Sequence, residues 1–145
     1  MLLCDVNVLV HAFEDTSPRH LEYRVWLLSH LRGVEPVGLC DPTVAGFLRV
    51  VTHPAIFTEP ATWGEAVAFV EALRDSPAYL PVAPGERHWA TVRDLGHRVG
   101  ARGNLVPDAW LAATAMANGA TLVTTDRGFA RFPGLRHVHP LEDAA

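Results

Sequence analysis

The chain has 145 residues, of which 49% are apolar and 19% are charged, and its formal net charge is −4. This composition excludes an intrinsically disordered chain, a collagen-like repeat and a coiled coil. The length fits one domain, residues 1–145, that buries a sizeable hydrophobic core. All twelve basic residues are arginine, against sixteen acidic residues, and this acidic balance argues at first sight against a nucleic-acid partner.

Signals for export or membrane insertion are not evident in the sequence. No apolar run approaches the roughly 18 residues that a membrane-spanning helix needs. The first residues have no basic start, and Asp5 interrupts their apolar run, so a signal peptide is not expected. Cys4 and Cys40 are too few for a disulfide framework, and we expect both to be buried, reduced thiols. The sequence therefore predicts a cytoplasmic protein with no membrane partner.

Apolar periodicity and turn residues predict alternating strands and helices. In chain order we expect a strand at 2–6, helices at 7–13 and 19–32, a strand at 36–40, helices at 43–51 and 62–73, a strand at 79–82, helices at 86–99 and 107–118, a strand at 121–125 and a helical turn at 127–132. Thr62 and Glu65 have the spacing of a capping box, and Pro107 and Gly119 are typical of the two ends of a helix. Strands separated by helices predict an α/β fold, a single α/β/α sandwich around a central, mostly parallel sheet.

Four aspartates fall where predicted strands end or helices begin. Asp5 and Asp126 end strands, Asp108 lies in the first turn of a largely apolar helix, and Asp41 follows the second strand. Because ligands bind at the carboxyl ends of parallel strands, these carboxylates are expected to converge. Close carboxylates repel one another unless a cation lies between them, and hard oxygen ligands favour Mg²⁺ or Mn²⁺. Such ions activate water for phosphodiester hydrolysis.

Each aspartate also has a simpler interpretation. Asp108 could cap its helix or interact with the helix dipole, Asp126 could be a turn residue, and Asp41 could be an N-cap. Asp5 is harder to explain in this way, because an acid inside an apolar stretch is unfavourable without partners. For the tryptophans, core packing is a simpler interpretation than base stacking, and this applies to Trp26, Trp63, Trp89 and Trp110.

Four sequence blocks together resemble a known family. They are LCDVNVL at 3–9, GFLRVVTHP at 46–54, GNLVPDAWLAA at 103–113 and LVTTDRGFARFPGL at 122–135. In this order they resemble the PIN-domain ribonucleases, and among them the VapC toxins of bacterial toxin–antitoxin pairs. The resemblance extends over nearly the whole chain.

The resemblance implies a metal-dependent endoribonuclease on a PIN-like α/β/α fold. Its first, third and fourth acids match Asp5, Asp108 and Asp126, with Asn7 beside the first and Thr124 supporting the fourth. Mg²⁺ is assigned in the family to the positions of Asp5 and Asp108, and Asp126 is a further candidate ligand. The resemblance also implies an RNA substrate, a cognate VapB-like antitoxin and a homodimer.

One position departs from the family pattern. The second acid of the family, a glutamate, falls on Gly46, which cannot bind a metal. Asp41, about one turn earlier, is a candidate replacement, and a site with three acids is the alternative.

The resulting hypothesis is hydrolysis of RNA by metal-activated water. Arginine binds phosphate in a bidentate manner, and the best candidates for the RNA track are Arg49, Arg98, Arg102 and Arg127. For each of these arginines taken singly, a solvated surface charge is the simpler interpretation. Two other functions stay open: a catalytically weak RNA-binding or regulatory module, and a phosphatase of the haloacid dehalogenase class. The phosphatase would need a D-x-D pair, which Asp5-Val6-Asn7 lacks.

Overall fold

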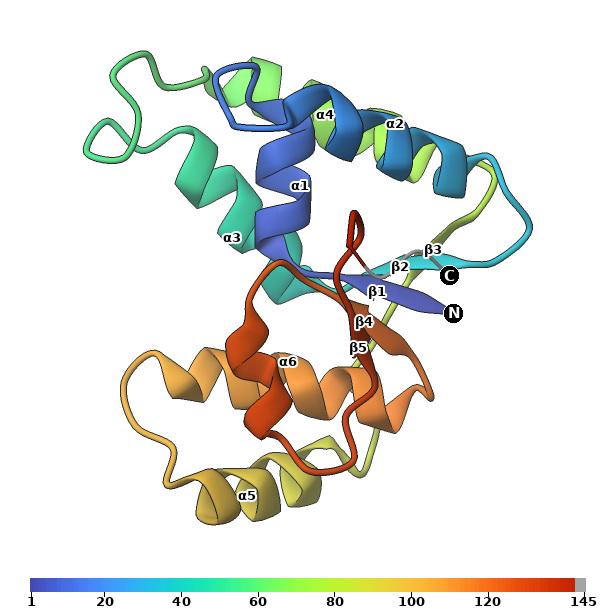
Figure 1. The fold of residues 1–145 in the computed structure, drawn as a ribbon, viewed down its shortest axis with the longest axis vertical. Helices are drawn as coiled ribbons and strands as arrows, with labels where there is room; N and C mark the ends of the chain where they lie inside the picture. Colours follow the sequence, from blue (N-terminus) through green and yellow to red (C-terminus); the bar gives the residue numbers. More distant parts are fainter. Residues whose placement is uncertain (143–145) are drawn as a thin grey trace.

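A parallel β-sheet organises the part of the chain that the computed structural model describes, residues 1–142 (Figure 1). Five strands within this range pair in the order β3-β2-β1-β4-β5, and all neighbouring pairs are parallel. The strands are β1 (Leu2–Cys4), β2 (Val37–Leu39), β3 (Tyr79–Pro81), β4 (Thr121–Val123) and β5 (His137–Val138). The predicted α/β/α fold is therefore confirmed.

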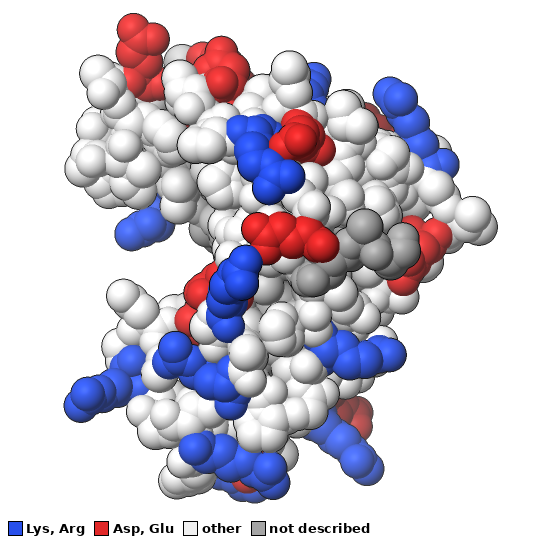
Figure 2. Space-filling model, viewed as in Figure 1, with Lys and Arg blue, Asp and Glu red and all other residues white. Residues whose placement is uncertain are grey.

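Helices cover both faces of this sheet (Figure 1). One side carries α1 (Val6–Phe13), α2 (His20–Leu31), α3 (Asp41–Val51) and α4 (Trp63–Arg74), and the other carries α5 (His88–Val99), α6 (Leu105–Ala117) and the 3₁₀ helix η1 (Arg127–Arg131). We call these the α1–α4 side and the α5–α6 side. No helix in residues 1–142 is long and apolar enough to cross a bilayer. The surface is hollowed where the two sides meet (Figure 2).

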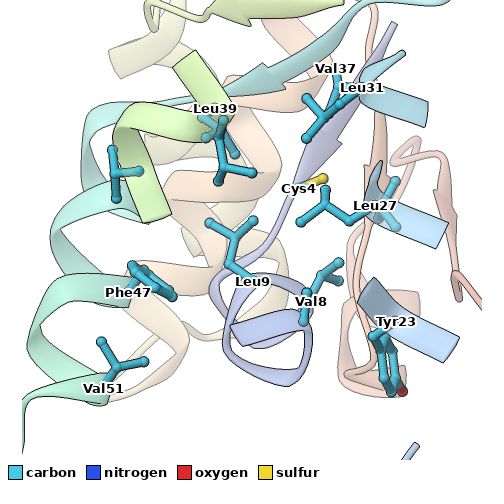
Figure 3. Close-up of a cluster of buried hydrophobic side chains, with 14 of the residues drawn as sticks. Cys4, Val8, Leu9, Tyr23, Leu27, Leu31, Val37, Leu39, Phe47 and Val51 are labelled. Carbon is cyan, nitrogen blue, oxygen red and sulfur yellow. The ribbon is translucent and has the colours of Figure 1, made fainter. Parts of the chain in front are cut away.

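The alternation of side chains along the strands builds two separate hydrophobic cores. Cys4 and Val123 point into the core of the α1–α4 side, which also contains Phe47 (Figure 3). Their neighbours Leu3 and Leu122 point into the other core, beneath α5 and α6. Successive strand residues face opposite sides of a sheet, so strands buried on both faces are apolar at every position. This explains why short continuous apolar runs predict these strands.

Several element boundaries differ from the prediction. β1 ends at Cys4, two residues early, because the Asp5 side chain accepts a hydrogen bond from the Val6 N–H and so caps α1. α3 begins at Asp41, with Cys40 as its N-cap, so the interpretation of Asp41 as an N-cap is wrong. α6 begins at Leu105 and places Asp108 as its fourth residue. Strand β5 was not among the predicted elements.

Other local predictions are confirmed. Thr62 and Glu65 form the reciprocal hydrogen bonds of a capping box at the start of α4. Cys4 and Cys40 are buried free thiols. The expectation that the tryptophans pack in the core is wrong in three cases, since the exposed fractions are 67% for Trp63, 64% for Trp89 and 38% for Trp110.

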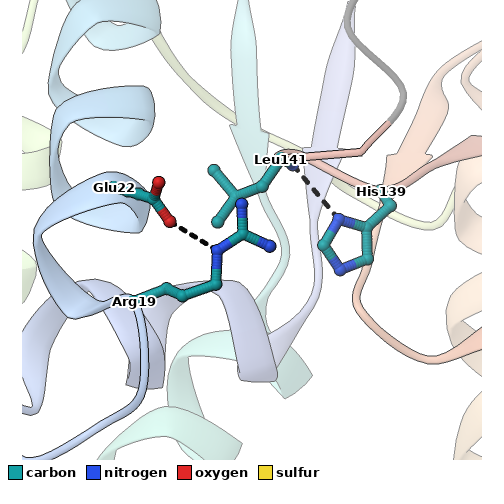
Figure 4. A network of polar contacts seen from close by, with 4 residues as sticks. All are labelled: Arg19, Glu22, His139 and Leu141. Carbon is teal, nitrogen blue, oxygen red and sulfur yellow. Dashed lines mark hydrogen bonds and ion pairs between the residues drawn. The ribbon is translucent and has the colours of Figure 1, made fainter.

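Residues 139–142, which follow β5, lie beside the start of α2 (Figure 4). The His139 ring lies 6.3 Å from the ring of Tyr23, measured between centroids. Arg19 and Glu22 form an ion pair beside it, and the Leu141 N–H donates a hydrogen bond to Nδ1 of His139 (3.1 Å). Residues 139–142 therefore pack on the α1–α4 side of the sheet.

Candidate active site

A cleft of about 700 Å³ opens beside the carboxyl ends of β1 and β4. Residues of α1 and α3 form one wall, and residues of α6 form the other. Three of the four predicted aspartates line this cleft: Asp5, Asp108 and Asp126. On the face drawn in Figure 2, acidic side chains lie at the inner end of the hollow. The structure thus brings together residues that are more than 100 positions apart in the sequence.

Asp5 directly follows β1, and hydrogen bonds hold both oxygens of its carboxylate. Oδ1 accepts from the backbone N–H of Val6 (2.7 Å). Oδ2 accepts from the hydroxyl of Thr124 (2.7 Å) and from the side-chain amide of Asn7 (3.0 Å). These are the partners that an acid in an apolar stretch requires. They fix the orientation of the carboxylate at the floor of the cleft.

The buried hydroxyl of Thr124 joins the ends of β1 and β4. Besides donating to Asp5, it accepts hydrogen bonds from the Asp126 N–H (3.0 Å) and from the Asn7 amide (3.2 Å). The side-chain oxygen Oδ1 of Asn7 in turn accepts a hydrogen bond from the Thr125 N–H (3.1 Å). Asn7 and Thr124 therefore act on the site through the groups they hold in place.

Asp126 has both of the roles considered from the sequence. Its Oδ1 accepts a hydrogen bond from the Gly128 N–H (2.8 Å) and thereby caps η1. The same side chain lines the cleft. A turn residue and a cleft residue are therefore compatible at this position.

Asp108 lies in the first turn of α6 and lines the cleft from the opposite wall. It accepts no hydrogen bond from the residues that the structure describes, so it does not cap its helix through its side chain. Its negative charge is nonetheless favourable near a helix N-terminus. The carboxylate is left available to a ligand in the cleft.

Burial and neighbouring negative charges raise the pKa of two of these carboxyl groups. Burial raises the pKa of Asp5 and the charge of Asp126 raises it further, while hydrogen bonds from Thr124 and neighbouring groups oppose this. Burial likewise raises the pKa of Asp108, helped by Asp126 and Asp5 and opposed by Arg131. A carboxyl group whose pKa is raised by neighbouring acids favours a bound proton or a bound cation.

Gly46, which aligns with the glutamate of the family, packs directly against α1. A Cβ atom placed at this position would lie 2.8 Å from Cγ2 of Val6, closer than real Cβ contacts come. The side chain of Val6, next to Asp5, therefore fills the space that a side chain at position 46 would need. Asp41 is exposed at the start of α3 and does not line the cleft, although its neighbour Pro42 does.

The four arginines proposed for an RNA track are exposed and lie outside the cleft lining. Arg49 is in the last turn of α3, Arg98 in the last turn of α5, and Arg102 in the loop that leads into α6. Arg127 forms an ion pair with Glu142, with 2.7 Å between nitrogen and oxygen. The structure therefore does not gather these arginines into the acidic cleft.

Two features in or near the cleft were missed in the sequence. Arg131 is close enough to lower the pKa of Asp108, but nothing in the local sequence distinguishes it from other arginines. The apolar wall formed by Val106, Trp110 and Leu111 was also missed. Its signal was present in part, since Val106 and Trp110 lie four positions apart and therefore on one face of α6.

The donor set of the cleft suits a hard divalent cation. Asp5, Asp108 and Asp126 offer carboxylate oxygens, the ligands that Mg²⁺ and Mn²⁺ prefer. Within residues 1–142, no three acidic, histidine or cysteine side chains are close enough to form a ligand cluster. Mg²⁺ commonly keeps several waters and binds through one or two carboxylates, so an incomplete protein shell is compatible with it.

Comparison with known proteins gives a consistent family. The model of the PIN domain matches residues 2–135. VapC ribonuclease Mb2897 of Mycobacterium bovis is 48% identical over 142 residues, which cover 98% of this chain and 97% of that protein. Ribonuclease VapC25 of Mycobacterium tuberculosis is 40% identical over 140 residues, covering 97% and 99% of the two chains.

Solved structures agree on the fold. VapBC2 from Rickettsia felis, bound to a DNA fragment from its promoter, superposes with a TM-score of 0.68 at 16% identity, covering 94% of this chain and 96% of that one. VapC20 of Mycobacterium tuberculosis, described as a sarcin-ricin loop cleaving toxin, gives 0.67 at 15% identity, covering 94% and 99%. The haloacid dehalogenase alternative finds no support in these comparisons. The chain belongs to the PIN-domain family and groups there with the VapC proteins.

Proposed function

We propose that this protein is a divalent-metal-dependent endoribonuclease that hydrolyses RNA phosphodiesters with an activated water. The observation that carries the proposal is the convergence of Asp5, Asp108 and Asp126 on one cleft. An RNA substrate is supported by the relatives named VapC ribonucleases, which match nearly the whole chain.

The residues of the cleft have distinct roles in this proposal. Asp5 and Asp108 hold Mg²⁺ or Mn²⁺, and Asp126 is the third candidate ligand. When bound, the ion supplies a Lewis acid that lowers the pKa of a water and offsets the charge of the phosphodiester. Asn7 and Thr124 keep the Asp5 carboxylate in one orientation through the hydrogen bonds described above. Preorganised ligands of this kind need no rearrangement as charge develops on the substrate.

The biological role in this proposal is that of the toxin of a VapBC-type pair in the cytoplasm. Similar folds occur in solved structures described as VapBC complexes, which supports a VapB-like antitoxin as partner. A homodimer is the expected state of the free protein. Size-exclusion chromatography with light scattering, with and without the co-expressed antitoxin, tests both assemblies.

The test of the activity compares the unaltered protein with Asp5→Ala and Asp108→Asn on total RNA in Mg²⁺ or Mn²⁺. Cleavage should require the divalent ion and be lost in both variants. Asp94→Asn is the matched control, because this aspartate is exposed on α5 and away from the cleft. Metal-dependent cleavage that persists in Asp5→Ala would exclude the proposed mechanism.

A second candidate function is a catalytically weak RNA-binding or regulatory module. Gly46 in place of the glutamate, and the absence of a complete ligand cluster in residues 1–142, favour it. Tight RNA binding without turnover in any divalent ion would select this function over the first.

A further inference from the structure

Two residues of the apolar wall, Val106 and Trp110, belong to one stripe of α6 beside the acidic groups of the cleft. Val106, Trp110 and Thr114 follow one another at intervals of four residues, and all three line the cleft. The exposed fractions are 47% for Val106 and 38% for Trp110. Trp110, the only tryptophan among the described residues that line the cleft, lies two positions from Asp108 in the sequence.

The Trp110 ring packs against a buried histidine. The ring of His88 contacts it edge-on, with 4.7 Å between centroids and 67° between planes. Nε2 of His88 lies 3.1 Å from the backbone oxygen of Trp110 and 3.0 Å from the hydroxyl of Thr114. His88 is thus anchored to α6 by two contacts, and its ring limits the movement of the Trp110 ring. A fixed aromatic surface loses little conformational freedom when a second ring stacks on it.

The charges of the cleft make phosphate contacts an unsuitable source of affinity there. No arginine is among the described residues that line it, whereas Asp5, Asp108 and Asp126 are. These carboxylates repel the phosphates of an RNA strand unless cations offset them. A nucleobase is uncharged and stacks on an aromatic ring whatever its identity.

We propose that Trp110 is the stacking platform for a nucleobase next to the phosphodiester that is cleaved. This inference rests on the proposed ribonuclease function and assigns Trp110 a positioning role, because stacking would hold the strand while the carboxylates act on the phosphate. An apolar segment of a protein partner is the competing occupant of this wall. The base is favoured because the wall adjoins the carboxylates assigned to the chemistry.

The first experiment measures cleavage kinetics of a single-stranded oligoribonucleotide by four variants. Trp110→Ala and Trp110→Leu should raise KM by roughly 5- to 100-fold with a smaller change in kcat, the loss expected for one base stack. Trp110→Phe should restore KM to near its original value. Trp89→Ala is the matched control, because Trp89 is 64% exposed and does not line the cleft. The leucine variant preserves bulk against His88, so a folding defect in the alanine variant leaves the test intact.

The second experiment uses RNA substrates that carry an abasic nucleotide at each position in turn around the site that the unaltered protein cleaves. At one position next to the scissile phosphate, the abasic substrate should raise KM for the unaltered protein but not further for Trp110→Leu. Such non-additivity identifies the two groups that contact each other.

The outcomes separate the two proposals. If the unaltered protein neither binds nor cleaves RNA, the proposed function fails. If it cleaves and the KM of Trp110→Leu is unchanged, the stacking inference fails and the proposed function stands. Unchanged cleavage together with weaker inhibition of Trp110→Leu by the antitoxin would assign the wall to a protein partner and overturn the inference.

Discussion

The side chain of Val6 limits what position 46 can hold. A β-branched residue has few rotamers, so Val6 cannot easily turn away from a Cβ atom at 2.8 Å. Gly46→Ala should therefore destabilise the fold by about 1–2 kcal/mol, although alanine is the better helix former. Urea denaturation of the variant measures this difference.

A double-mutant cycle isolates the contact between Val6 and Gly46. In a Val6→Ala background the obstructing methyl groups are gone, so Gly46→Ala should become stabilising by about 0.5–1 kcal/mol, its helix-propensity gain. If Gly46→Ala changes the free energy of unfolding equally in both backgrounds, contact with Val6 does not determine the effect of a side chain at position 46. Gly46→Glu in the Val6→Ala background then tests whether the family's acid increases metal-dependent activity.

The raised pKa values of Asp5 and Asp108 predict how stability depends on pH. The folded protein binds these protons more tightly than the unfolded chain, so their contribution to stability is full below about pH 4 and is lost as the pH rises through the raised pKa values. Asp108→Asn should therefore raise the Tm at pH 7 without divalent ions, and the gain should disappear at low pH. Thermal unfolding with and without Mg²⁺ measures it, and Mg²⁺ should stabilise the unaltered protein more than the variant. If the Tm of Asp108→Asn at pH 7 is lower than that of the unaltered protein, repulsion between Asp108 and the neighbouring carboxylates does not destabilise the fold.

At the residue scale, the chemistry of the local sequence decides which site residues can be identified from the sequence alone. Asp5 was recognisable because a carboxylate between Cys4 and Val6 requires partners, and the structure supplies them. The exposure of Trp110 was not recognisable, because an aromatic residue on a helix packs inward or outward according to its tertiary neighbours. The same holds for Arg131, which the fold alone brings close enough to lower the pKa of Asp108.

At the element scale, the ends of β1 and β4 depend on one hydroxyl group. Thr124→Val keeps the shape of the side chain but leaves Asp5 Oδ2 and the Asp126 N–H each short of a hydrogen bond. We expect a loss of about 1–3 kcal/mol in stability and a large loss of RNA cleavage. Denaturation and cleavage assays measure both effects.

Two variants control this prediction. Thr124→Ser retains the hydroxyl and should recover most of the activity. Thr62→Ala removes the N-cap of α4, outside the cleft lining, and should lower stability by about 1 kcal/mol without changing cleavage kinetics. Wild-type cleavage by Thr124→Val would show that the hydroxyl does not position Asp5.

The type of an element was predictable where its apolar periodicity extended over many residues. The first and last residues of the elements were not predictable in this way. The start of α4 was predictable because its capping box lies within four consecutive residues, from Thr62 to Glu65. The end of β1 was missed because Asp5 caps α1 by accepting a hydrogen bond from the Val6 N–H, and a continuous apolar run does not reveal this turn. Strand β5 contains two residues, and its pairing with β4 is a tertiary interaction that no short pattern encodes.

At the scale of the whole molecule, charge is distributed unevenly. Residues 1–82 contain five arginines and ten acids, whereas residues 83–136 contain seven arginines and four acids, two of which are Asp108 and Asp126 of the cleft. On the face drawn in Figure 2, most basic side chains lie on the α5–α6 side. The net charge of −4 is therefore no argument against RNA, since one side of the molecule is locally basic.

This asymmetry predicts where an RNA strand leaves the cleft. Arg102→Gln should reduce the slope of log K against log salt by roughly 0.7 if it contacts one phosphate of a single strand. Arg24→Gln, on the exposed surface of the acidic α1–α4 side, should leave the slope unchanged. Fluorescence anisotropy titrations at several salt concentrations measure both slopes. An unchanged slope in the Arg102 variant would remove this residue from the track.

The two hydrophobic cores each contain one cysteine, and this provides two natural reporters of local opening. Cys4 lies in the core of the α1–α4 side and Cys40 in that of the α5–α6 side. Burial and the neighbouring charge of Asp5 raise the pKa of the Cys4 thiol to about 12, so it is unreactive while the fold is closed. Pulsed alkylation read by mass spectrometry can thus time the exposure of each thiol separately. Equal rates would mean that the two layers open as one cooperative unit, and unequal rates would identify the layer that yields first.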